Sequence, residues 1–474
     1  MPGSDYPYLY ERTASADELA RRFAGLEPGA SSRTVAGVAG RLRSVRAHGK
    51  VAFADLADES GSIQLFARLQ NLGEDGLARF EQLGVGDIVG ARGEVVRTRR
   101  GELSLDLEDF VLLAECRSPM PEKWGGLTNV ETRYRQRHLD LAVNPESRGL
   151  VRARARANAE IRRFLGERGF LEVETPQMQL QAGGALARPF VTHLNTLDID
   201  LYLRIAPELY IKRLLIGGFE RVFELGKVFR NEGVSTKHNP EFTMLEAYEA
   251  YVDYHHTMAL VEDLVRSLAK AVNGTTALDI EGRRIDLADP FRRITMFEAI
   301  EEHAGVDLSG AWKDGDLETL AAVAEDNGIE VERSWGPGKV LAEIFELAAE
   351  KRILQPTFVT GYPKEVSPLA KDHREIDGFT EQADLVIGGV ELAPIYSELN
   401  DPQEQRRRFE QQVRAHTAGD EEAHVADEAF LDALAYGMPP AGGFGLGVDR
   451  LLVLLTGANS IREIILFPIL RPES

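Results

Sequence analysis

Four residues spaced two apart, with an arginine shortly before them, form the most chemically suggestive pattern in this 474-residue sequence. They lie in segment 219–254, where two β-like runs flank the turn-rich loop GVSTKHNP and predict a long hairpin. Arg230 ends the first strand, and the residues that share one face of the second are Phe242, Met244, Glu246 and Tyr248. A guanidinium binds phosphate and an aromatic ring stacks on a base, so this face suits a nucleotide. Taken alone, Phe242 and Met244 favour the alternative, a place in the core.

A second segment, DLVIGGVELAPIYSEL (384–399), brings two carboxylates together. Gly388-Gly389 is a two-residue hairpin turn whose pairing puts Asp384 on the same face as Glu391, diagonal to it and within about 8 Å. Carboxylates at that distance repel unless a cation lies between them, and oxygen ligands select a hard ion such as Mg²⁺. The alternative is two solvated acids on an edge strand.

The alternation of this segment has a break. Pro394, Tyr396 and Glu398 alternate with one another but are out of phase with Glu391. We therefore predict a bulge or kink between Glu391 and Pro394, which would let both sets of side chains reach one pocket.

A glycine-rich strand followed by an apolar helix is predicted for GGFGLGVDRLLVLLTG (442–457), with Asp449 and Arg450 in the first helical turn. The GxGxG spacing, without a surrounding βαβ unit, argues against a dinucleotide fingerprint. Close approach of the backbone to a ligand or to another chain explains the glycines better.

Other kinds of chemistry have little support. The single cysteine, Cys116, excludes an internal disulfide and a multi-cysteine zinc site, and no GxSxG motif is present, so covalent catalysis through a side chain is not expected. No run approaches about 18 apolar residues, and the N-terminus lacks the features of a signal peptide. We expect a cytoplasmic protein with no membrane partner.

The order of the expected elements predicts an α+β protein. A short helix capped by Ser15 (15–26) precedes five β runs and one helix-like interval, which match a five-stranded OB-fold β-barrel. After a connector come a basic amphipathic helix (151–170), the strand FLEVET, and an antiparallel sheet flanked by helices. The expected boundaries are 1–30 for the N-terminal helical extension, 31–117 for the barrel, 118–150 for the connector and 151–474 for the C-terminal domain built on this sheet.

The net charge of −21, taken alone, discourages a nucleic-acid partner. The charge is unevenly distributed, however, because the first 150 residues carry −2 and the other 324 carry −19. Between Pro28 and Ala54 there are five basic residues and no acid. Such asymmetry indicates a module that faces nucleic acid, with a solvated basic strand as the alternative.

Together these segments closely resemble the class II lysyl-tRNA synthetases of the bacterial type. GFLEVETP resembles the first motif of class II, FRNEG followed by HNPEFT the second, and GLGVDR the third. Other segments resemble the lysyl-tRNA synthetases in particular: GKVAFADLADESGSIQ, RYRQRHLDL, LYLRIAPELYIKRLLIGGFERVFE, EVSPLA and YSELNDP. The resemblance runs from about residue 33 to residue 472. It implies a class II catalytic domain that activates L-lysine with ATP and transfers it to the 3′ end of tRNA(Lys), with Mg²⁺ as cofactor.

The resemblance also implies roles for individual residues. The catalytic residues would be Arg230, bridging the lysine carboxylate and the α-phosphate, and Arg450. ATP would be bound by Arg230, Glu232, His238, Phe242, Glu391 and Arg450, with Phe242 and Arg450 on either side of the adenine. Mg²⁺ would be bound by Asp384 and Glu391.

Lysine would be bound by Gly184, Glu208, Arg230, Glu246, Tyr248, Tyr396 and Glu398. Gly184 and Glu208 would contact the α-amino group, Tyr396 the methylene chain, and Glu398 with Tyr248 the ε-ammonium group. A neutral analogue would leave a buried carboxylate unpaired, so we expect no editing domain.

Two positions depart from the family. Pro394 stands where many members have an asparagine that helps to bind the substrate carboxylate, and Asp384 stands at the position of a metal-binding glutamate. A lowered affinity for lysine or a slightly altered substrate would follow from these departures.

In the barrel, Phe53 and Gln64 match the family's anticodon readers, with Arg46 beside them; without the resemblance, Phe53 would be assigned to the barrel core. The first-motif helix and Pro176 imply a homodimer. Two alternative functions stay open: a non-catalytic or regulatory paralogue, and a ligase that lysylates a non-tRNA acceptor, against which the barrel argues.

Overall fold

The computed structural model describes residues 6–121, 127–185, 187–280, 282–332, 335–417 and 427–473. It divides into two compact units, Met1–Asn144 and Pro145–Ser474. The predicted connector (118–150) is divided between these units, and its residues 122–126 lie outside the described residues. None of the described helices is long and apolar enough to span a membrane.

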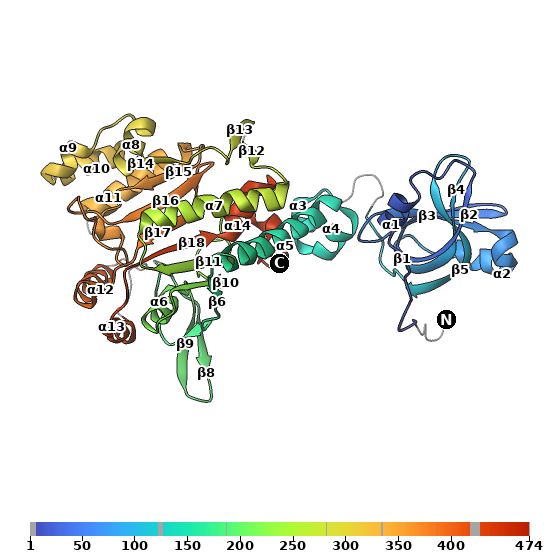
Figure 1. Ribbon diagram of the computed structural model, residues 1–474, viewed down its shortest axis with the longest axis horizontal. Helices are drawn as coiled ribbons and strands as arrows, with labels where there is room; N and C mark the ends of the chain where they lie inside the picture. The colour runs from blue at the N-terminus through green and yellow to red at the C-terminus, as the bar shows by residue number, and fades with distance from the viewer. Residues whose placement is uncertain are drawn as a thin grey trace. The chain divides into compact units, whose positions relative to one another are not determined.

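The first unit contains a closed five-stranded barrel with the strand order β1-β2-β3-β5-β4 (Figure 1). The predicted barrel and its single intervening helix are therefore confirmed. Its elements are β1 (Ser31–His48), β2 (Val51–Ala57), β3 (Ser62–Arg68), α2 (Leu69–Glu81), β4 (Ile88–Arg97) and β5 (Leu103–Ala114), preceded by α1 (Ala16–Arg22) and followed by α3 (Val130–Arg135) and α4 (Arg137–Val143).

Helix α1 begins with the capping box expected at Ser15, where the side chain of Glu18 accepts from the Ser15 backbone N–H at 2.7 Å. The expectation that this helix extends to residue 26 is wrong, because it ends at Arg22. Gly25 and Pro28 follow, and both residue types disfavour another helical turn.

The second unit is built on an eight-stranded sheet with the order β14-β15-β16-β17-β18-β11-β10-β6 (Figure 1). Pairing is antiparallel from β15 to β10 and parallel at both edges, which confirms the predicted α+β fold with a mainly antiparallel sheet. The strands are β6 (Leu171–Glu172), β10 (Arg221–Phe229), β11 (Glu241–Ala250), β14 (Arg292–Thr295), β15 (Thr357–Thr360), β16 (Gln382–Ile387), β17 (Val390–Ser397) and β18 (Ala441–Gly447). Two small sheets consist of β7 (Met178–Gln179), β9 (Ile199–Leu203) and β8 (Val191–Leu194), and of β12 (Ala277–Ile280) and β13 (Arg283–Asp286).

Helices flank this sheet. They are α5 (Pro145–Gly166), α6 (Glu208–Ile216), α7 (Tyr254–Asn273), α8 (Met296–Ala304), α9 (Ser309–Asp314), α10 (Leu317–Asp326), α11 (Pro337–Ile344), α12 (Pro402–Thr417), α13 (Glu428–Leu434), α14 (Val448–Thr456) and α15 (Ile461–Ile464). A π-helical turn (Phe345–Ala349) and a 3₁₀ turn (Glu350–Arg352) continue α11, and a second 3₁₀ turn spans Lys364–Val366.

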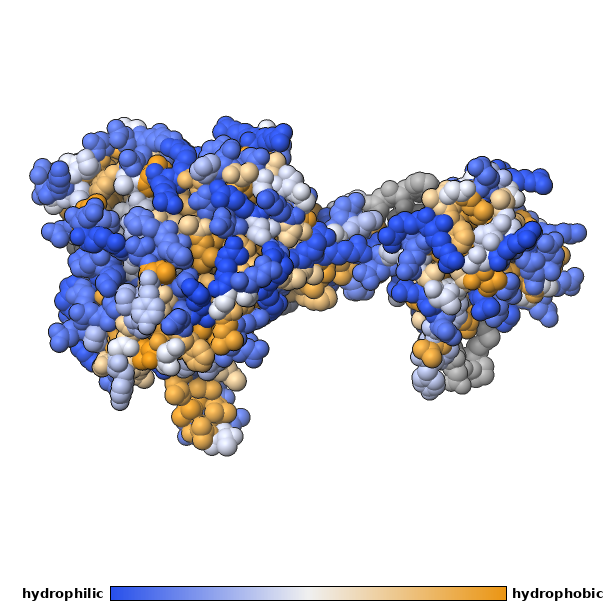
Figure 2. All heavy atoms as spheres, in the orientation of Figure 1, coloured by the Kyte–Doolittle hydropathy of each residue, from blue (hydrophilic) through white to orange (hydrophobic). Residues whose placement is uncertain are grey.

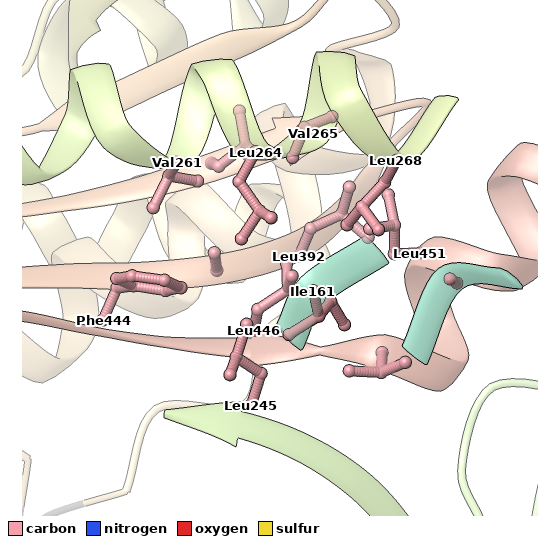
Figure 3. Close-up of a cluster of buried hydrophobic side chains, with 14 of the residues drawn as sticks. Ile161, Leu245, Val261, Leu264, Val265, Leu268, Leu392, Phe444, Leu446 and Leu451 are labelled. Atoms are coloured by element: carbon pink, nitrogen blue, oxygen red, sulfur yellow. The ribbon is translucent and has the colours of Figure 1, made fainter. Parts of the chain in front are cut away.

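The two faces of the sheet have different surroundings because successive side chains of a strand point to opposite sides. One face packs against α5, α7 and α14 in the main hydrophobic core, where Ile161, Leu264 and Leu451 meet Leu245 and Phe444 (Figure 3). The other face receives the alternate positions of the same strands, which are the positions that carry the predicted site residues.

Two predicted boundaries near the start of this unit are wrong. The helix expected over 151–170 spans Pro145–Gly166, with proline in its first turn. The expected strand FLEVET is in register with β10 only at Leu171 and Glu172, and its last backbone hydrogen bond to β10 is from Val173 N–H to Phe223 O at 2.9 Å. Thr175 binds instead to the Glu224 side chain at 2.7 Å.

Candidate active site

Arg230 lies directly after β10, at the base of the predicted hairpin. Strands β10 and β11 pair without a break, and the Arg230 backbone N–H then donates to Pro240 O at 2.9 Å. The guanidinium lies 5.3 Å from the centre of the Phe242 ring, and its Nε is buried with no hydrogen-bond partner among the described residues. Burial lowers the pKa of Arg230. A cation with an unsatisfied donor at this point is suited to an anionic ligand.

A bulge brings the residues of the second hairpin onto one face. Val386 pairs with Glu391 as predicted, and the register then shifts so that Asp384 pairs with Pro394. The extra residue is Leu392, which is buried in the core. The predicted bulge between Glu391 and Pro394 is therefore confirmed, and it places Glu391, Pro394 and Asp384 on the same side of the sheet.

Asp384 and Glu391 lie inside the eight-stranded sheet, so the alternative of two solvated acids on an edge strand is wrong. Asp384 is buried and accepts from Gln382 Nε2 at 3.0 Å. Burial and the neighbouring Glu391 raise the pKa of Asp384 well above its usual range. The pair is chemically suited to a hard divalent cation that would relieve this repulsion.

A third carboxylate, Glu350, approaches the same pair from the 3₁₀ turn after α11. The Glu391 backbone N–H donates to Glu350 Oε1 at 3.3 Å. Burial and Glu391 raise the pKa of Glu350 to about 7. Within the described ranges, no group of three or more His, Cys, Asp or Glu side chains is arranged to hold a metal by itself. A cation bound here would therefore share its coordination with a ligand such as a phosphate.

One cavity lies between the loop after β10 and the start of α14. Its lining includes Arg230, Glu232, His238, Phe242, Glu391 and Arg450, all of the residues expected to bind ATP. The assignment of Phe242 and Met244 to the core is therefore wrong, because both side chains line this cavity.

His238 and Arg450 are held together at the wall of this cavity. Arg450 Nη2 lies 3.2 Å from His238 Nε2, and His238 Nδ1 lies 3.0 Å from Ser235 Oγ. Burial and Arg450 lower the pKa of His238. Because arginine can only donate, His238 Nε2 accepts and the proton of the neutral ring is on Nδ1.

Asp449, next to Arg450, anchors the first turn of α14 to two other elements. Its Oδ2 accepts from the Thr243 backbone N–H of β11 at 2.6 Å, and its Oδ1 pairs with Arg154 of α5. Arg450 Nη1 donates to Glu391 O at 3.1 Å. These contacts fix Arg450 relative to both hairpins.

A second cavity adjoins the first. The two share Arg230, Met244, Glu391, Pro394 and Gly445 as lining residues. The second is also lined by Gly184, Glu208, Glu246, Tyr248, Asp384 and Tyr396. Arg230 therefore lies at the junction of the cavity expected for the nucleotide and the cavity expected for the amino acid.

Glu208, Glu246 and Glu398 make the second cavity strongly acidic. Tyr248 Oη donates to Glu246 Oε2 at 3.0 Å, and burial together with Glu208 raises the pKa of Glu246 well above its usual range. Glu398 is 1% exposed and lies behind the lining residues rather than on the open wall. Its Oε1 has no hydrogen-bond partner among the described residues.

Sequence reasoning missed Lys212, which pairs with two of these carboxylates. Its Nζ lies 2.6 Å from Glu208 Oε1 and 2.6 Å from Glu398 Oε2, and the side chain is fully buried. The i, i+4 spacing of Glu208 and Lys212 is a signal that could have identified half of this contact.

Glycines of β18 accommodate these side chains. A Cβ at Gly443 would collide with Glu398 and with the ring of Tyr248. The close backbone approach predicted for this strand is present, but at Gly443 the approaching groups belong to the same chain rather than to a ligand or another chain. Gly445 lines both cavities and leaves their junction open.

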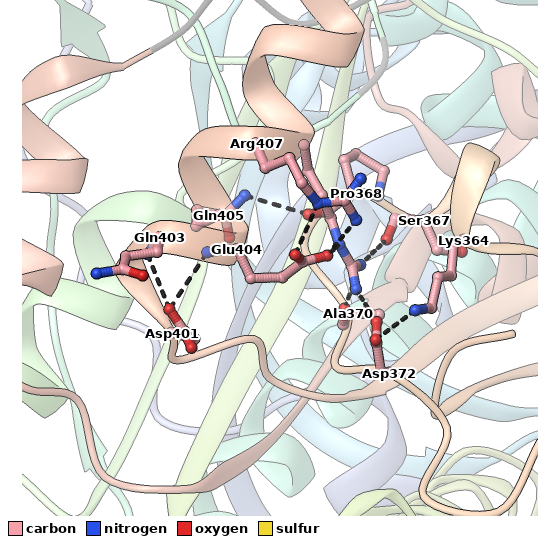
Figure 4. Close-up of polar contacts among 11 residues, drawn as sticks. Lys364, Ser367, Pro368, Ala370, Asp372, Asp401, Gln403, Glu404, Gln405 and Arg407 are labelled. Carbon is pink, nitrogen blue, oxygen red and sulfur yellow. Dashed lines mark hydrogen bonds and ion pairs between the residues drawn. The ribbon is translucent and has the colours of Figure 1, made fainter. Parts of the chain in front are cut away.

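The segment 366–369 forms another wall of the second cavity and was given no role from the sequence. Helix α12 holds it through backbone carbonyls: Gln405 Nε2 donates to Pro368 O at 3.1 Å, and Arg408 Nη1 donates to Ser367 O at 2.9 Å and to Ala370 O at 2.6 Å (Figure 4). Such contacts fix the shape of the wall.

The residues expected to read an anticodon share one face of the barrel. Across neighbouring strands Arg46 pairs with Phe53 and Phe53 with Phe66, and the rings of Phe53 and Phe66 stack at 4.8 Å with an angle of 2° between them. Gln64 lies on the same strand as Phe66 and accepts from Ser104 Oγ at 3.0 Å. Phe53 is half-buried, on the opposite side of β2 from the buried Ala52 and Ala54, so its assignment to the barrel core is wrong.

Comparison with known proteins matches both units. Residues 129–471 match the family model described as tRNA synthetases class II (D, K and N), and residues 37–113 match that of an OB-fold nucleic acid binding domain. The chain is 52% identical to the lysine–tRNA ligase of Moorella thermoacetica over 98% of its length and 93% of that protein. It is 51% identical to the lysine–tRNA ligase of Gloeobacter violaceus, over 99% of this chain and 95% of the other.

Proposed function

Because the chain belongs to the class II tRNA synthetases of the D, K and N group, we propose that it is a lysine–tRNA ligase that joins L-lysine to the 3′ end of tRNA(Lys) with ATP. The observation that carries the choice of amino acid is Glu398 Oε1, which is buried behind an acidic cavity lined by Glu208 and Glu246 and has no hydrogen-bond partner among the described residues. An ammonium group satisfies such an oxygen, whereas a neutral side chain leaves it unpaired.

The reaction has two steps. In the first, an oxygen of the lysine carboxylate attacks the α-phosphorus of ATP, and the bond to the β-phosphate oxygen breaks to release pyrophosphate. In the second, the terminal ribose hydroxyl of tRNA attacks the lysyl carbonyl and releases AMP, while its proton passes to solvent or to the leaving phosphate. Positioning and stabilisation of charge dominate this kind of chemistry.

Arg230 is the group best placed to serve the first step, since it borders both cavities. Its guanidinium would bind the carboxylate and the α-phosphate at once and stabilise the charge that develops between them. Phe242 and Arg450 would hold the adenine, while Glu232 and His238 would bind the rest of the nucleotide. Gly184 and Glu208 would bind the α-amino group, Tyr396 the methylene chain, and Glu398 with Tyr248 the ε-ammonium.

Asp384 and Glu391 would hold Mg²⁺. Their fit to the ion rests on an oxygen-only donor pair, with Asp384 buried and Glu391 partly exposed, whose mutual repulsion is relieved by a cation. When bound, the ion would neutralise charge on the ATP phosphates.

The barrel supports tRNA as the acceptor. Arg46, Phe53 and Gln64 would read the anticodon by stacking and hydrogen bonding. A non-tRNA acceptor would leave this face without a role, and a regulatory paralogue would have no need of both cavities. We also infer a cytoplasmic location, where tRNA is charged.

We further infer a homodimer. The small β7–β9–β8 sheet and its hairpin turn expose several apolar side chains, among them Met178 (58% exposed), Val191 (61%) and Leu197 (64%). Figure 2 shows the apolar surface where the β8–β9 hairpin protrudes. Apolar patches of this kind mark interfaces. A second copy of the chain is the occupant that the first-motif resemblance favours.

Lysine-dependent ATP–pyrophosphate exchange tests the function. Exchange should occur with L-lysine and not with the other nineteen amino acids. Glu398→Gln should raise the KM for lysine at least about 100-fold and change that for ATP less than threefold, because a neutral amide cannot replace a buried carboxylate. Glu249→Gln is the matched control. Glu249, on β11, is buried like Glu398, but it pairs with Arg221 outside both cavities. Equal losses for lysine and ATP in Glu398→Gln would contradict the proposal.

A further inference from the structure

Lys212 is a fully buried cation behind the wall of an amino-acid cavity that is itself proposed to bind a cationic substrate. It lies on α6, one helical turn after Glu208, and its Nζ is 2.6 Å from Glu208 Oε1. The same Nζ is 2.6 Å from Glu398 Oε2, directly after β17. One ammonium group therefore joins a carboxylate on the wall of the cavity to a carboxylate behind it.

Lys212 makes its closest contact with one oxygen of each carboxylate, Glu208 Oε1 and Glu398 Oε2. The other oxygen of Glu398, Oε1, is buried and has no hydrogen-bond partner in the described part of the chain. We propose that Lys212 is a positioning residue for amino-acid recognition, which holds one oxygen of Glu208 and one of Glu398 so that the other oxygen of each is left for an ammonium group of the substrate. This inference rests on the proposed function.

The charges of the pocket agree with this role. The ionisable groups that face Glu398 are Lys212, Glu208, Glu246 and the hydroxyls of Tyr248 and Tyr396. Arg230, Asp384 and Glu391 line the part of the cavity proposed for the substrate carboxylate and Mg²⁺. Among the remaining groups, when Glu208, Glu246 and Glu398 are ionised, Lys212 leaves two negative charges uncompensated, and free lysine has two ammonium groups. A buried pocket with balanced charge binds its ligand without an unpaired ion, whereas an amino acid with one ammonium group leaves a carboxylate uncompensated.

Removal of Lys212 should change how the pocket responds to pH. Burial raises the pKa of Glu398 to about 7, and Lys212 opposes that effect. Without the cation, the pKa of Glu398 should rise further, so the carboxylate should be protonated over more of the neutral range. Lysine binding would then require a higher pH.

The test compares Lys212→Met with the wild-type enzyme in lysine-dependent ATP–pyrophosphate exchange. We expect the KM for lysine to rise at least 30-fold, the KM for ATP to stay within threefold, and the inflection of kcat/KM for lysine to move to higher pH. Arg213→Met is the matched control, because Arg213 is the next residue of α6 and pairs with Asp427 outside the pocket at 3.3 Å. It should leave all three quantities unchanged.

A purely structural role for Lys212 would lower the affinities for lysine and ATP together and would leave the pH inflection in place, and that result would overturn the proposal. If Lys212→Met does not fold, a double variant that combines Lys212→Met with Glu398→Gln removes one charge of each sign. Its KM for lysine should be at least tenfold higher than that of Glu398→Gln alone, because Glu208 has lost its partner. Equal KM values in these two variants would overturn the proposal. Failure of the wild-type enzyme to activate lysine would instead reject the proposed function.

Discussion

Asp384 and Pro394 are direct partners across the β16–β17 hairpin, because the bulge at Leu392 shifts the register of that hairpin by one residue. The pairing places a buried carboxylate next to a ring that has no hydrogen-bond donor, at the junction of the two cavities. The resemblance noted from the sequence implies an asparagine at this position in many family members. Pro394 lacks the amide donor with which such an asparagine would help to bind the substrate carboxylate.

Replacing Pro394 with asparagine should strengthen lysine binding. A hydrogen bond to a charged group contributes about 1.5–3 kcal/mol, so the KM for lysine should fall roughly 10- to 150-fold. Proline is tolerated in this central hairpin because it lies next to a bulge, and asparagine can occupy the same extended backbone. Exchange kinetics with lysine and with ATP varied separately would measure the effect. If the KM for lysine is unchanged or higher, the absence of an amide donor at position 394 does not weaken lysine binding.

Arg230→Ala should reduce ATP–pyrophosphate exchange by at least about 10³-fold, because the guanidinium borders both cavities and its Nε has no other partner in the described residues. Arg221→Ala is the matched control. Arg221 begins the same strand and pairs with Glu249 at 2.7 Å, away from the cavities. Near-normal exchange in Arg230→Ala would remove the residue from the mechanism.

Local patterns in the sequence were sufficient to predict much of the site. The Gly388-Gly389 turn fixes which residues of its hairpin are opposite, and the break in alternation before Pro394 required the bulge that the structure contains. The alternation of Phe242, Met244, Glu246 and Tyr248 likewise identified the strand face that lines the two cavities.

Contacts between distant segments were not predictable in the same way. Lys212 binds Glu398 only because α6 and the end of β17 pack together, and no local pattern specifies that packing. The ends of two elements were also predicted wrongly. Helix α5 begins at Pro145, and the strand after it is shortened because Thr175 binds a side chain of β10. Tertiary partners decide such boundaries.

Lysine activation should weaken as the pH falls through 7. Burial raises the pKa of Glu398 to about 7, and only the ionised carboxylate can bind an ammonium group strongly. The value of kcat/KM for lysine, which reports the free enzyme, should therefore have its inflection near pH 7, level off above about pH 8 and fall up to tenfold per unit below about pH 6. Exchange measured from pH 6 to 8.5 at saturating ATP tests this, with the KM for ATP as the reference. A flat profile between pH 8 and 6 would contradict the assignment of Glu398.

Asp384→Asn should increase the Mg²⁺ concentration needed for half-maximal exchange by about tenfold at fixed ATP, because one of two charged ligands is lost. Glu343→Gln is a suitable control, since Glu343 is an acid of α11 that pairs with Lys339 at 2.8 Å. If the Mg²⁺ dependence of Asp384→Asn matches that of the control, the Asp384–Glu391 pair does not hold the ion.

Phe53→Ala should impair aminoacylation without affecting amino-acid activation. Phe53 presents a half-buried ring on the outer face of β2, stacked on Phe66 at 4.8 Å, and a base that stacks on an aromatic ring gains about 1–3 kcal/mol. The kcat/KM for tRNA should therefore fall roughly 5- to 150-fold, while lysine-dependent exchange, which needs no tRNA, stays at the wild-type rate. Because the barrel and the catalytic sheet belong to separate compact units, a defect confined to the barrel should not reach the cavities. A parallel loss of exchange would mean that the substitution disturbs the whole chain, and unchanged aminoacylation would remove Phe53 from the tRNA-binding face.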